Sequence, residues 1–444
     1  MIFVELAILL LMILIGSRMK GIGLGVMGMV GLLIFVLVFH MKPVEPPVAV
    51  LLIILAIVTT AATLQAAGGL DYLVSIAEKI IRRNPGQITF IAPFTTYFLC
   101  LFAGTSHIVY SLLPIIAEVS AKKRIRPERP LSISVIAAHL SLTGSPMSAA
   151  TASLAAILAY PAAALDIIKV CIPACLIGIL AGVLAVWKKG KELNDDPIFQ
   201  EKMKDPAFAK SIESSDEHKT ELKPGAKTAV LIFGIAILMI ILCGAFPQLL
   251  PNVGAGEAGL AVNANGDVNL TGMIIMITLS ASAMMMLILK ISPVEVTKMS
   301  LFTSMASALV SVLGVVWMSA TFMGANEALI EHTFGDIAGA HPWTFAFALF
   351  FMGALTFSQA ATTRTMMPIG LTLGITQPHL IAMFPAVNGD FLLPGYPTLV
   401  AAIDFDRTGS TRIGKYVVNH SFMVPGLVAV SVAVAVGFLL SFMV

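Results

Sequence analysis

Two clusters of small polar residues interrupt apolar stretches in corresponding parts of the chain. The candidate binding residues are Thr105, Ser106 and His107 in the first cluster and Ser358, Gln359, Thr362, Thr363 and Arg364 in the second. Hydroxyl groups donate hydrogen bonds without permanent charge, and a half-helix that begins at such a break adds free N–H groups and partial positive charge. Two such tips meeting inside a membrane would bind a small anion with a carboxylate at each end. The alternative for the first cluster is a kink at Gly104 packed against a neighbouring helix.

A second pair of breaks follows the two clusters. Pro130 to Pro146 and Pro378 to Pro394 span the same 16-residue step. The residues expected to line the same cavity here are Ser145 and Ser148 beside Pro146, and Tyr396 and Thr398 beside Pro394 and Pro397. Interrupted apolar segments at matching places in two halves are typical of the binding site of a secondary transporter.

Ionisable and amide side chains are rare within the apolar segments, so each is a candidate for function. Arg364 is expected either to grip a substrate carboxylate or to be paired internally, for example with Asp390. Asn388 and Asp390 precede the second break and could bind substrate, a cation or a proton. His139 and Gln65 are interpreted as hydrogen-bond partners between helices.

Composition places the chain in a membrane. Hydrophobic residues make up 58% and charged residues 12% of the 444 positions, whereas soluble domains carry about 25% charged residues. The net charge of +2 is spread over short loops, so no nucleic-acid partner is expected. The four cysteines lie in apolar runs and are expected to pack rather than form disulfides. No metal, cofactor or catalytic motif is present, so we predict no enzyme activity.

The predicted fold is an all-α polytopic membrane protein built from two inverted repeats, 1–187 and 227–444, joined by a cytoplasmic linker at 188–226. Each repeat contains a re-entrant hairpin (88–119 and 343–373) and a broken membrane helix (131–160 and 378–404). The other predicted membrane helices are 2–17, 21–39, 48–66, 166–187, 227–249, 270–290, 299–322 and 416–442. Amphipathic stretches at 70–83 and 325–338 precede the hairpins, and residues 2–16 are interpreted as a retained first helix.

The positive charges fit this topology. With the N-terminus outside and each hairpin returning to its own side, nearly all lysines and arginines fall in the predicted cytoplasmic loops, while Lys42 and Lys169 remain outside. Cytoplasmic loops of membrane proteins carry such an excess of positive charge. Both termini are therefore predicted to be periplasmic.

Several motifs resemble those of the anaerobic C4-dicarboxylate transporters of the Dcu type (DcuA and DcuB). The matching segments are 68–71, 78–79, 82–85, 103–105, 113–119, 126–131, 358–361, 393–394, 396–397, 411–415 and 419–420. Residues 104–110 and 126–130 lean toward the DcuB-like branch. Two departures are Ser106, where the pattern suggests glycine, and Gly395, where it suggests threonine.

This resemblance implies a carrier of the bacterial inner membrane that exchanges fumarate, malate or aspartate for succinate during anaerobic growth. The alternative is Na⁺- or H⁺-coupled uptake, for which Asp390 is the carboxylate nearest a break. Carriers with paired re-entrant hairpins also suggest an elevator motion and a homodimer.

Overall fold

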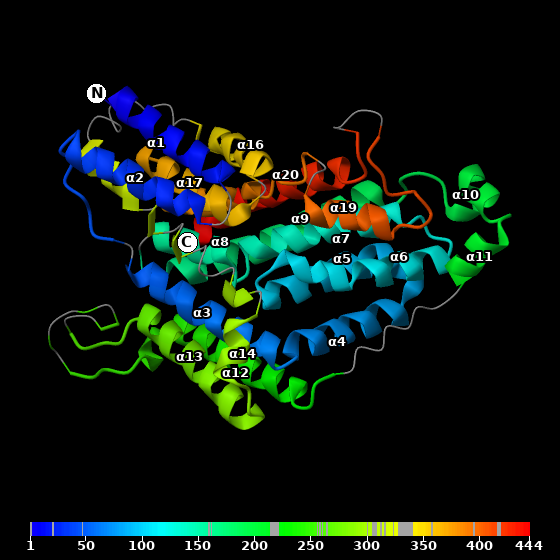
Figure 1. Ribbon diagram of the computed structural model, residues 1–444, viewed down its shortest axis with the longest axis horizontal. Coiled ribbons are helices and arrows are strands. Elements are labelled where there is room, and N and C mark those ends of the chain that lie inside the picture. Colours follow the sequence, from blue (N-terminus) through cyan, green and yellow to red (C-terminus); the bar gives the residue numbers. More distant parts are fainter. Residues whose placement is uncertain are drawn as a thin grey trace.

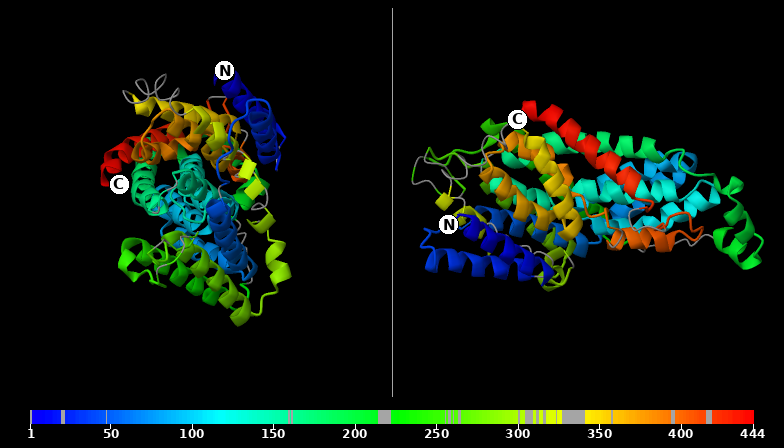
Figure 2. Two further views of the ribbon diagram at one scale, coloured as in Figure 1. Left: turned by 90° about the vertical axis from the view of Figure 1, so that its left-hand side faces the viewer. Right: turned by 90° about the horizontal axis from the view of Figure 1, so that it is seen from above.

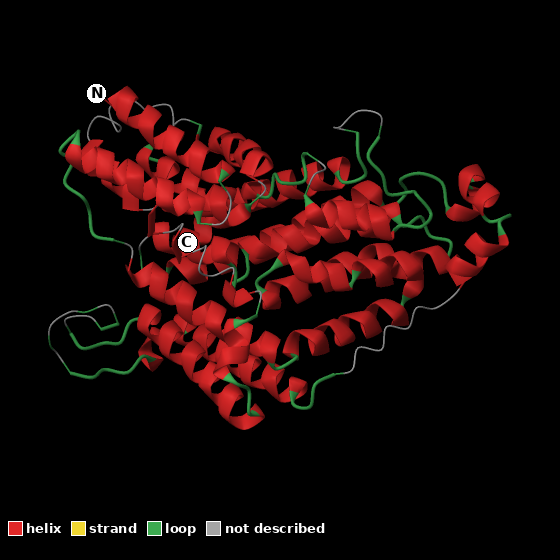
Figure 3. Cartoon of the chain, in the orientation of Figure 1, coloured by secondary structure: helices red, strands yellow, loops and turns green. Residues whose placement is uncertain are grey.

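The computed structural model describes the chain except residues 1, 20–21, 47, 159, 161, 214–221, 255, 257–258, 260, 263–264, 300, 304–308, 311–312, 315–316, 323, 327–340, 357, 394–395 and 415–418. Within the described residues the regular structure is helical, with isolated β-bridges and no strand (Figure 3). The predicted amphipathic stretch 325–338 and the break residue Pro394 lie mostly or wholly outside these residues.

The first half begins with two separate groups of packed helices. α1 and α2 pack together, and α3 packs against α12 and α13 of the second half (Figure 1). A left-handed Gly68 (φ 75°) separates α3 from α4, and the two helices meet at 70°. The elements are α1 (Ile2–Arg18), α2 (Gly23–Leu37), α3 (Val48–Ala66), α4 (Gly69–Arg83) and η1 (Pro85–Gln87).

The first predicted hairpin and broken helix are both interrupted where the sequence indicates. α5 ends at Ala103, and the chain then folds back against it through a short 3₁₀ helix. A non-helical turn around Pro146 separates the two parts of the broken helix. The elements are α5 (Ile88–Ala103), η2 (Ser106–Ser111), α6 (Leu113–Lys122), α7 (Glu128–Leu140), η3 (Ser141–Thr143), α8 (Ala149–Leu158) and α9 (Ala163–Val186).

The linker is partly helical and folds onto the end of the molecule. Figures 1 and 2 show α10 and α11 projecting beyond the helices that carry the hairpins. Leu193, Phe199 and Ile212 pack with Ala121 of α6 in a small apolar cluster. The linker elements are η4 (Leu193–Asp195), α10 (Pro197–Lys202) and α11 (Pro206–Glu213).

The second half runs from α12 to the end of the chain. Residues of the predicted 299–322 helix are described only in part, and Met318 and Phe322 pack against α1 and α2. The elements are α12 (Ala226–Ala245), η5 (Pro247–Leu249), α13 (Leu270–Leu289), α14 (Pro293–Thr297), η6 (Pro342–Thr344), α16 (Phe345–Thr356), α17 (Gln359–Thr372), α18 (Gln377–Met383), η7 (Phe384–Val387), α19 (Pro397–Phe405), α20 (Met423–Leu440) and η8 (Ser441–Met443).

Length and hydropathy identify membrane-spanning helices directly. Among the described residues, Pro85–Ala103, Ala163–Val186, Thr271–Leu289 and Met423–Met443 are long and apolar enough to cross a membrane, and the bent pair α3–α4 adds a fifth candidate. A helical chain with several such spans agrees with the predicted all-α polytopic membrane protein.

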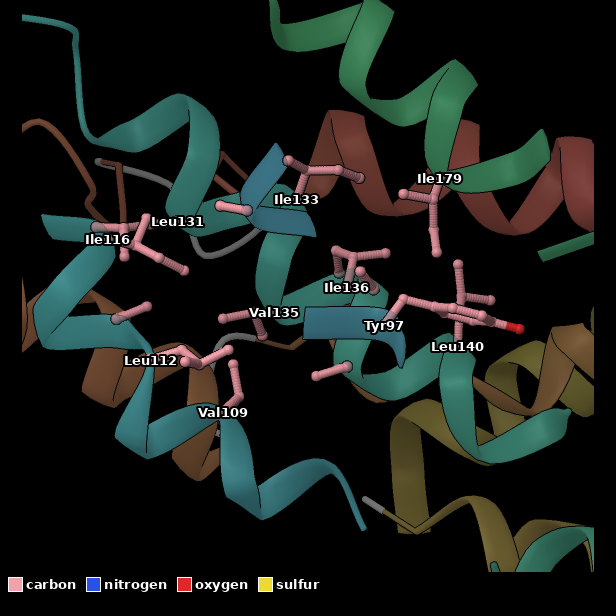
Figure 4. Packing of buried hydrophobic residues seen from close by; sticks show 14 of the residues in the cluster. Tyr97, Val109, Leu112, Ile116, Leu131, Ile133, Val135, Ile136, Leu140 and Ile179 are labelled. Carbon is pink, nitrogen blue, oxygen red and sulfur yellow. The ribbon is translucent and has the colours of Figure 1, made fainter. Parts of the chain in front are cut away.

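The largest apolar core joins the first hairpin to the broken helix. Tyr97 of α5, Val109 of η2, Ile116 of α6 and Val135 of α7 are buried in one cluster (Figure 4). α9 and α20 form the backing of this core, with Gly178 and Gly182 of α9 allowing close approach to α20. The hairpins are therefore supported by tightly packed helices rather than suspended on loops.

Near the breaks, elements of each half pack against elements of the other half. α8 packs against α17, the return limb of the second hairpin, while α19 packs against η2 and α6, the return limb of the first. Each hairpin thus contacts the broken helix of the other half. This exchange brings residues far apart in the sequence to one place.

Candidate substrate-binding site

Gly104 determines the shape of the first hairpin tip. Its φ of 68° is left-handed, and it ends α5 with an N–H that donates to the Cys100 carbonyl at 2.9 Å. A Cβ at this position would meet the Met147 Cβ at 2.6 Å and the Met147 carbonyl oxygen at 2.7 Å. Glycine is required here both by conformation and by the close approach of the α7–α8 turn.

Thr105 and Ser358 begin the return limbs of the two hairpins. The Thr105 hydroxyl oxygen accepts a hydrogen bond from the His107 N–H at 3.3 Å, and the Ser358 hydroxyl oxygen accepts one from the Ala361 N–H at 3.2 Å. Both residues have the extended backbone of an N-cap. Hydroxyl caps at breaks inside apolar segments satisfy N–H groups that would otherwise have no partner.

A cavity of about 680 Å³ lies between the two tips. The predicted residues that line it are Gly104, Thr105, Ser106, His107, Ser148, Ser358, Gln359, Arg364 and Tyr396. These residues come from both hairpins and both broken helices. The structure therefore brings together the four breaks that the sequence singled out.

Four predicted binding hydroxyls are instead buried in internal hydrogen bonds and do not line the cavity. The Ser145 hydroxyl donates to the Leu101 carbonyl at 2.6 Å. The hydroxyls of Thr362 and Thr363 donate to the carbonyls of Ser358 and Gln359 at 2.9 and 2.7 Å, and that of Thr398 pairs with His139. These four side chains shape the tips and breaks rather than border the space between them.

The helix-break prolines have different placements. Pro146 lies in the turn between η3 and α8, and Pro397 is the first residue of α19. At the first helical position a proline loses no intrahelical hydrogen bond, so Pro397 starts the helix rather than breaks it.

Asp390 is the centre of a buried polar network that crosses between the halves. Its Oδ1 lies 3.0 Å from Nδ1 of His139, and its Oδ2 accepts a hydrogen bond from Nε2 of Gln359 at 2.8 Å. His139 Nε2 lies 2.8 Å from the Thr398 hydroxyl, and its ring packs edge-on against Tyr396 with centroids 4.8 Å apart. Asn388 is also buried, and its amide donates to the Pro385 carbonyl at 2.9 Å.

The network extends to the cavity wall. Tyr396 lines the cavity and its side chain interacts with that of Ser106 in the first hairpin tip. His139 was interpreted from the sequence as a partner between helices, and its contacts with Asp390 and Thr398 confirm this. The partner suggested for Arg364, the Asp390 carboxylate, is bonded by His139 and Gln359.

Three polar residues of the cavity were not predicted to bind substrate: Gln65, Asp71 and Ser111. Gln65 also accepts a hydrogen bond from the Leu301 N–H at 3.5 Å. Asp71 belongs to the amphipathic helix α4, and its position two residues after the Gly68-Gly69 pair was the available signal.

A second cavity of about 610 Å³ adjoins the first and shares Asp71, Val74 and Ser111 with it. Charged side chains of α4 and α6 line it, including Arg82, whose guanidinium lies 2.8 Å from Glu78 and 3.0 Å from Glu118. Its wall is completed by Asp404 and Arg407 and by Ile212, which belongs to the linker. The two cavities share part of their walls and extend from the tips toward the linker end of the molecule.

Across the described part of the chain, no group of three or more His, Cys, Asp or Glu side chains is arranged to hold a metal ion. Cys100, Cys171, Cys175 and Cys243 are buried free thiols, as predicted.

Interrupted apolar segments that meet at a cavity are typical of secondary transporters. The model of the anaerobic C4-dicarboxylate membrane transporter family (DcuA_DcuB) matches residues 1–444. The chain belongs to this family, as the resemblance indicated. The family consists of transporters rather than enzymes, which confirms that prediction.

Similar proteins cover the whole chain. It is 39% identical over 446 residues to the C4-dicarboxylate transporter DcuA of Escherichia coli strain K12, covering 100% of both chains. It is 38% identical over 448 residues to the anaerobic C4-dicarboxylate transporter DcuB of Escherichia coli O6:H1, covering 99% of this chain and 98% of that one. These identities do not favour either branch, so the lean toward DcuB gains no support.

A more distant similarity is to a solved structure, the Alcanivorax borkumensis YdaH transporter, described as having an unusual topology. It has a TM-score of 0.46 and 15% sequence identity, covering 89% of this chain and 85% of that chain.

Proposed function

We propose that this chain exchanges C4-dicarboxylates across the bacterial inner membrane during anaerobic growth, taking up fumarate, malate or aspartate and releasing succinate. The observation that carries the proposal is the convergence of Thr105, Ser358 and Arg364 on one cavity. Neutral donors from two hairpin tips, together with one guanidinium, suit an anion with a carboxylate at each end. The names of the similar DcuA and DcuB proteins support the same substrate class.

The binding mode follows from the arrangement of donors. One carboxylate would accept hydrogen bonds at the first tip, from Thr105 and the N–H groups that begin η2. The other would lie between Ser358 and Arg364 at the second tip, where a guanidinium can bind a carboxylate through two N–H groups. Ser106 and Tyr396 would close the wall between them.

We further propose that residues 1–187 and 227–444 are inverted repeats that carry the substrate by an elevator motion. The exchange of contacts between each hairpin and the opposite broken helix supports this pairing. α1, α2, α3, α12 and α13 would form the scaffold of a homodimer, and the hairpins would move with the broken helices, α9 and α20. The charged second cavity borders Glu118 and the linker, both predicted to be cytoplasmic, so this conformation would face inward with both termini periplasmic.

A second candidate function is Na⁺- or H⁺-coupled uptake of the same acids. The buried Asp390 carboxylate favours it, because a buried carboxylate beside a histidine could take up a proton during the cycle. In this mode Asp390 would change protonation, and transport would depend on the ion gradient.

Counterflow in reconstituted liposomes distinguishes the two modes. Vesicles loaded with unlabelled succinate and vesicles without internal dicarboxylate receive labelled fumarate in Na⁺-free buffer. Exchange predicts uptake into the loaded vesicles alone. Uptake into unloaded vesicles that requires Na⁺ or a proton gradient would overturn obligate exchange and support the coupled mode, and absence of dicarboxylate transport under all conditions would overturn both.

A further inference from the structure

Gln359 borders the cavity at the tip of the second hairpin, and its amide nitrogen is hydrogen-bonded to Asp390, a residue that does not line the cavity. Gln359 is the first residue of α17 and has 4% of its surface exposed. Its Nε2 donates to Oδ2 of Asp390 at 2.8 Å, while the other carboxylate oxygen lies 3.0 Å from Nδ1 of His139. Asp390 therefore has a side-chain partner at each oxygen.

The chemistry of Asp390 determines which way this amide faces. An ionised carboxylate accepts hydrogen bonds and cannot donate them. With the amide reversed, two acceptor oxygens would lie at the 2.8 Å now spanned by the hydrogen bond, which is repulsive. The structure has the amino group of Gln359 facing Asp390, so its Oε1 lies on the opposite edge of the amide.

The amide oxygen is consequently available to a ligand. Within the described residues no hydrogen bond is recorded for Oε1 of Gln359, and this residue borders the cavity beside Ser358 and Arg364. Its neighbours at the tips are mainly donors, suited to carboxylates. Gln359 adds an acceptor to a site otherwise built for anions.

We propose that Gln359 is a specificity-determining residue whose amide oxygen accepts a hydrogen bond from a donor group on C2 of the substrate. It would favour the hydroxy and amino C4 acids, malate and aspartate, over fumarate and succinate, which carry no such donor. Thr105, Ser358 and Arg364 recognise the carboxylates that all four acids share and so cannot make this distinction. The inference rests on the proposed dicarboxylate transport and adds a basis for selection among its substrates.

The degree of discrimination between substrates depends on whether water can reach the amide oxygen. When fumarate or succinate is bound, water can satisfy the amide oxygen, so the oxygen favours donor-bearing acids without excluding the others. One hydrogen bond to a charged or hydroxyl donor then corresponds to a discrimination of about tenfold.

The test compares competition profiles in counterflow. Labelled fumarate uptake is inhibited by unlabelled L-aspartate, L-malate and succinate in the native chain and in Gln359→Met, whose side chain has similar length and no amide. The half-inhibitory concentrations of aspartate and malate relative to succinate should rise about tenfold in Gln359→Met. Thr356→Val is the matched control, because its hydroxyl pairs with Thr362 in the same tip at 2.8 Å and does not border the cavity.

A second variant guards against loss of folding. In Gln359→Glu at mildly acidic pH, a proton shared with Asp390 replaces the amide N–H, and the remaining oxygen still faces the cavity. This variant should retain the native ratios, measured by ligand-induced thermal shifts of the purified protein if transport is too slow.

Unchanged ratios in Gln359→Met, an equal loss of affinity for all the acids, or loss of the ratios in Gln359→Glu would each overturn the inference. None of these results would affect the proposed transport, which fails only if the native chain moves no dicarboxylate.

Discussion

Nδ1 of His139 lies 3.0 Å from Oδ1 of Asp390, across 251 positions of sequence, and neither side chain has more than 1% of its surface exposed. The pair ties α7, before the first break, to the segment that precedes the second. Asp390 also accepts a hydrogen bond from Gln359, and His139 also pairs with Thr398. The pair therefore links the second hairpin tip to both broken helices.

Replacing His139 by leucine should destabilise the protein strongly, because the buried Asp390 carboxylate loses one of its two side-chain partners. Leaving a buried polar group without its hydrogen-bond partner costs about 1–3 kcal/mol. Thermal unfolding in detergent should show a clear fall in melting temperature. The double variant His139→Leu/Asp390→Leu removes the buried carboxyl group as well and should recover part of the loss, whereas additive losses would contradict this coupling.

The hydroxyls of Thr105 and Ser358 should matter more for binding than for folding. Each caps a return limb and borders the cavity, so Thr105→Ala or Ser358→Ala should weaken dicarboxylate binding about tenfold while costing roughly 1 kcal/mol in stability. Binding is measured by isothermal titration with succinate. Thr105→Ser, which keeps the capping oxygen, is the matched control, and native affinity in both alanine variants would remove these hydroxyls from the site.

Two substitutions of Arg364 should separate the contribution of its charge from that of its geometry. Arg364→Met removes the cation and should lower counterflow of fumarate by roughly 10- to 100-fold. Arg364→Lys keeps the charge but not the two-pronged donor, so an intermediate rate is expected. Equal rates in Arg364→Met and the native chain, with melting temperatures confirming folded protein, would show that the guanidinium has no part in transport.

Glu128 should contribute a pH-dependent part of the stability at the linker end. Burial raises the pKa of this carboxyl, but hydrogen bonds from Arg126 and Lys189 and their positive charges outweigh burial, and the net pKa lies below the ordinary 4.5. A carboxyl whose pKa is lowered by folding stabilises the protein above its ordinary pKa. That contribution is lost as the pH falls below 4.5 and through the lowered pKa.

The measurement is melting temperature against pH for the native chain and Glu128→Gln. The glutamine variant should be less stable near pH 7, by on the order of 2 kcal/mol, and the two curves should converge in acid. A constant difference between the curves at every pH would mean that the ionised form of Glu128 is not the stabilising one.

The positions of the breaks could be predicted from the sequence, and the direction of individual hydroxyls could not. Gly104, Thr105 and Ser358 interrupt apolar runs, and backbone groups left unpaired in a membrane require polar partners there. Whether a hydroxyl faces a cavity or the carbonyl one turn earlier depends on its rotamer, which is why Thr362 and Thr363 were assigned to the cavity but bond their own helix.

Contacts between residues far apart in the chain could not be predicted from the sequence either. Nothing near His139 in the chain indicates that Asp390 is its partner, because the contact exists only once the two halves pack. Asp71 was missed for a related reason, since an acidic residue in an amphipathic helix normally faces bulk water, and here Asp71 lines the cavity.

The bend at Gly68 and the length of α4 bear on how the first hairpin could move. The helix has 15 residues, which makes it a stiff rod of about 22 Å. It is pivoted on a left-handed glycine at one end and fastened to the first hairpin by the Arg82–Glu118 ion pair near the other. A rod of this length swings its far end through about 12 Å for a rotation of roughly 30°, so in the proposed elevator motion the length of α4 would limit how far the hairpin bonded to it can travel.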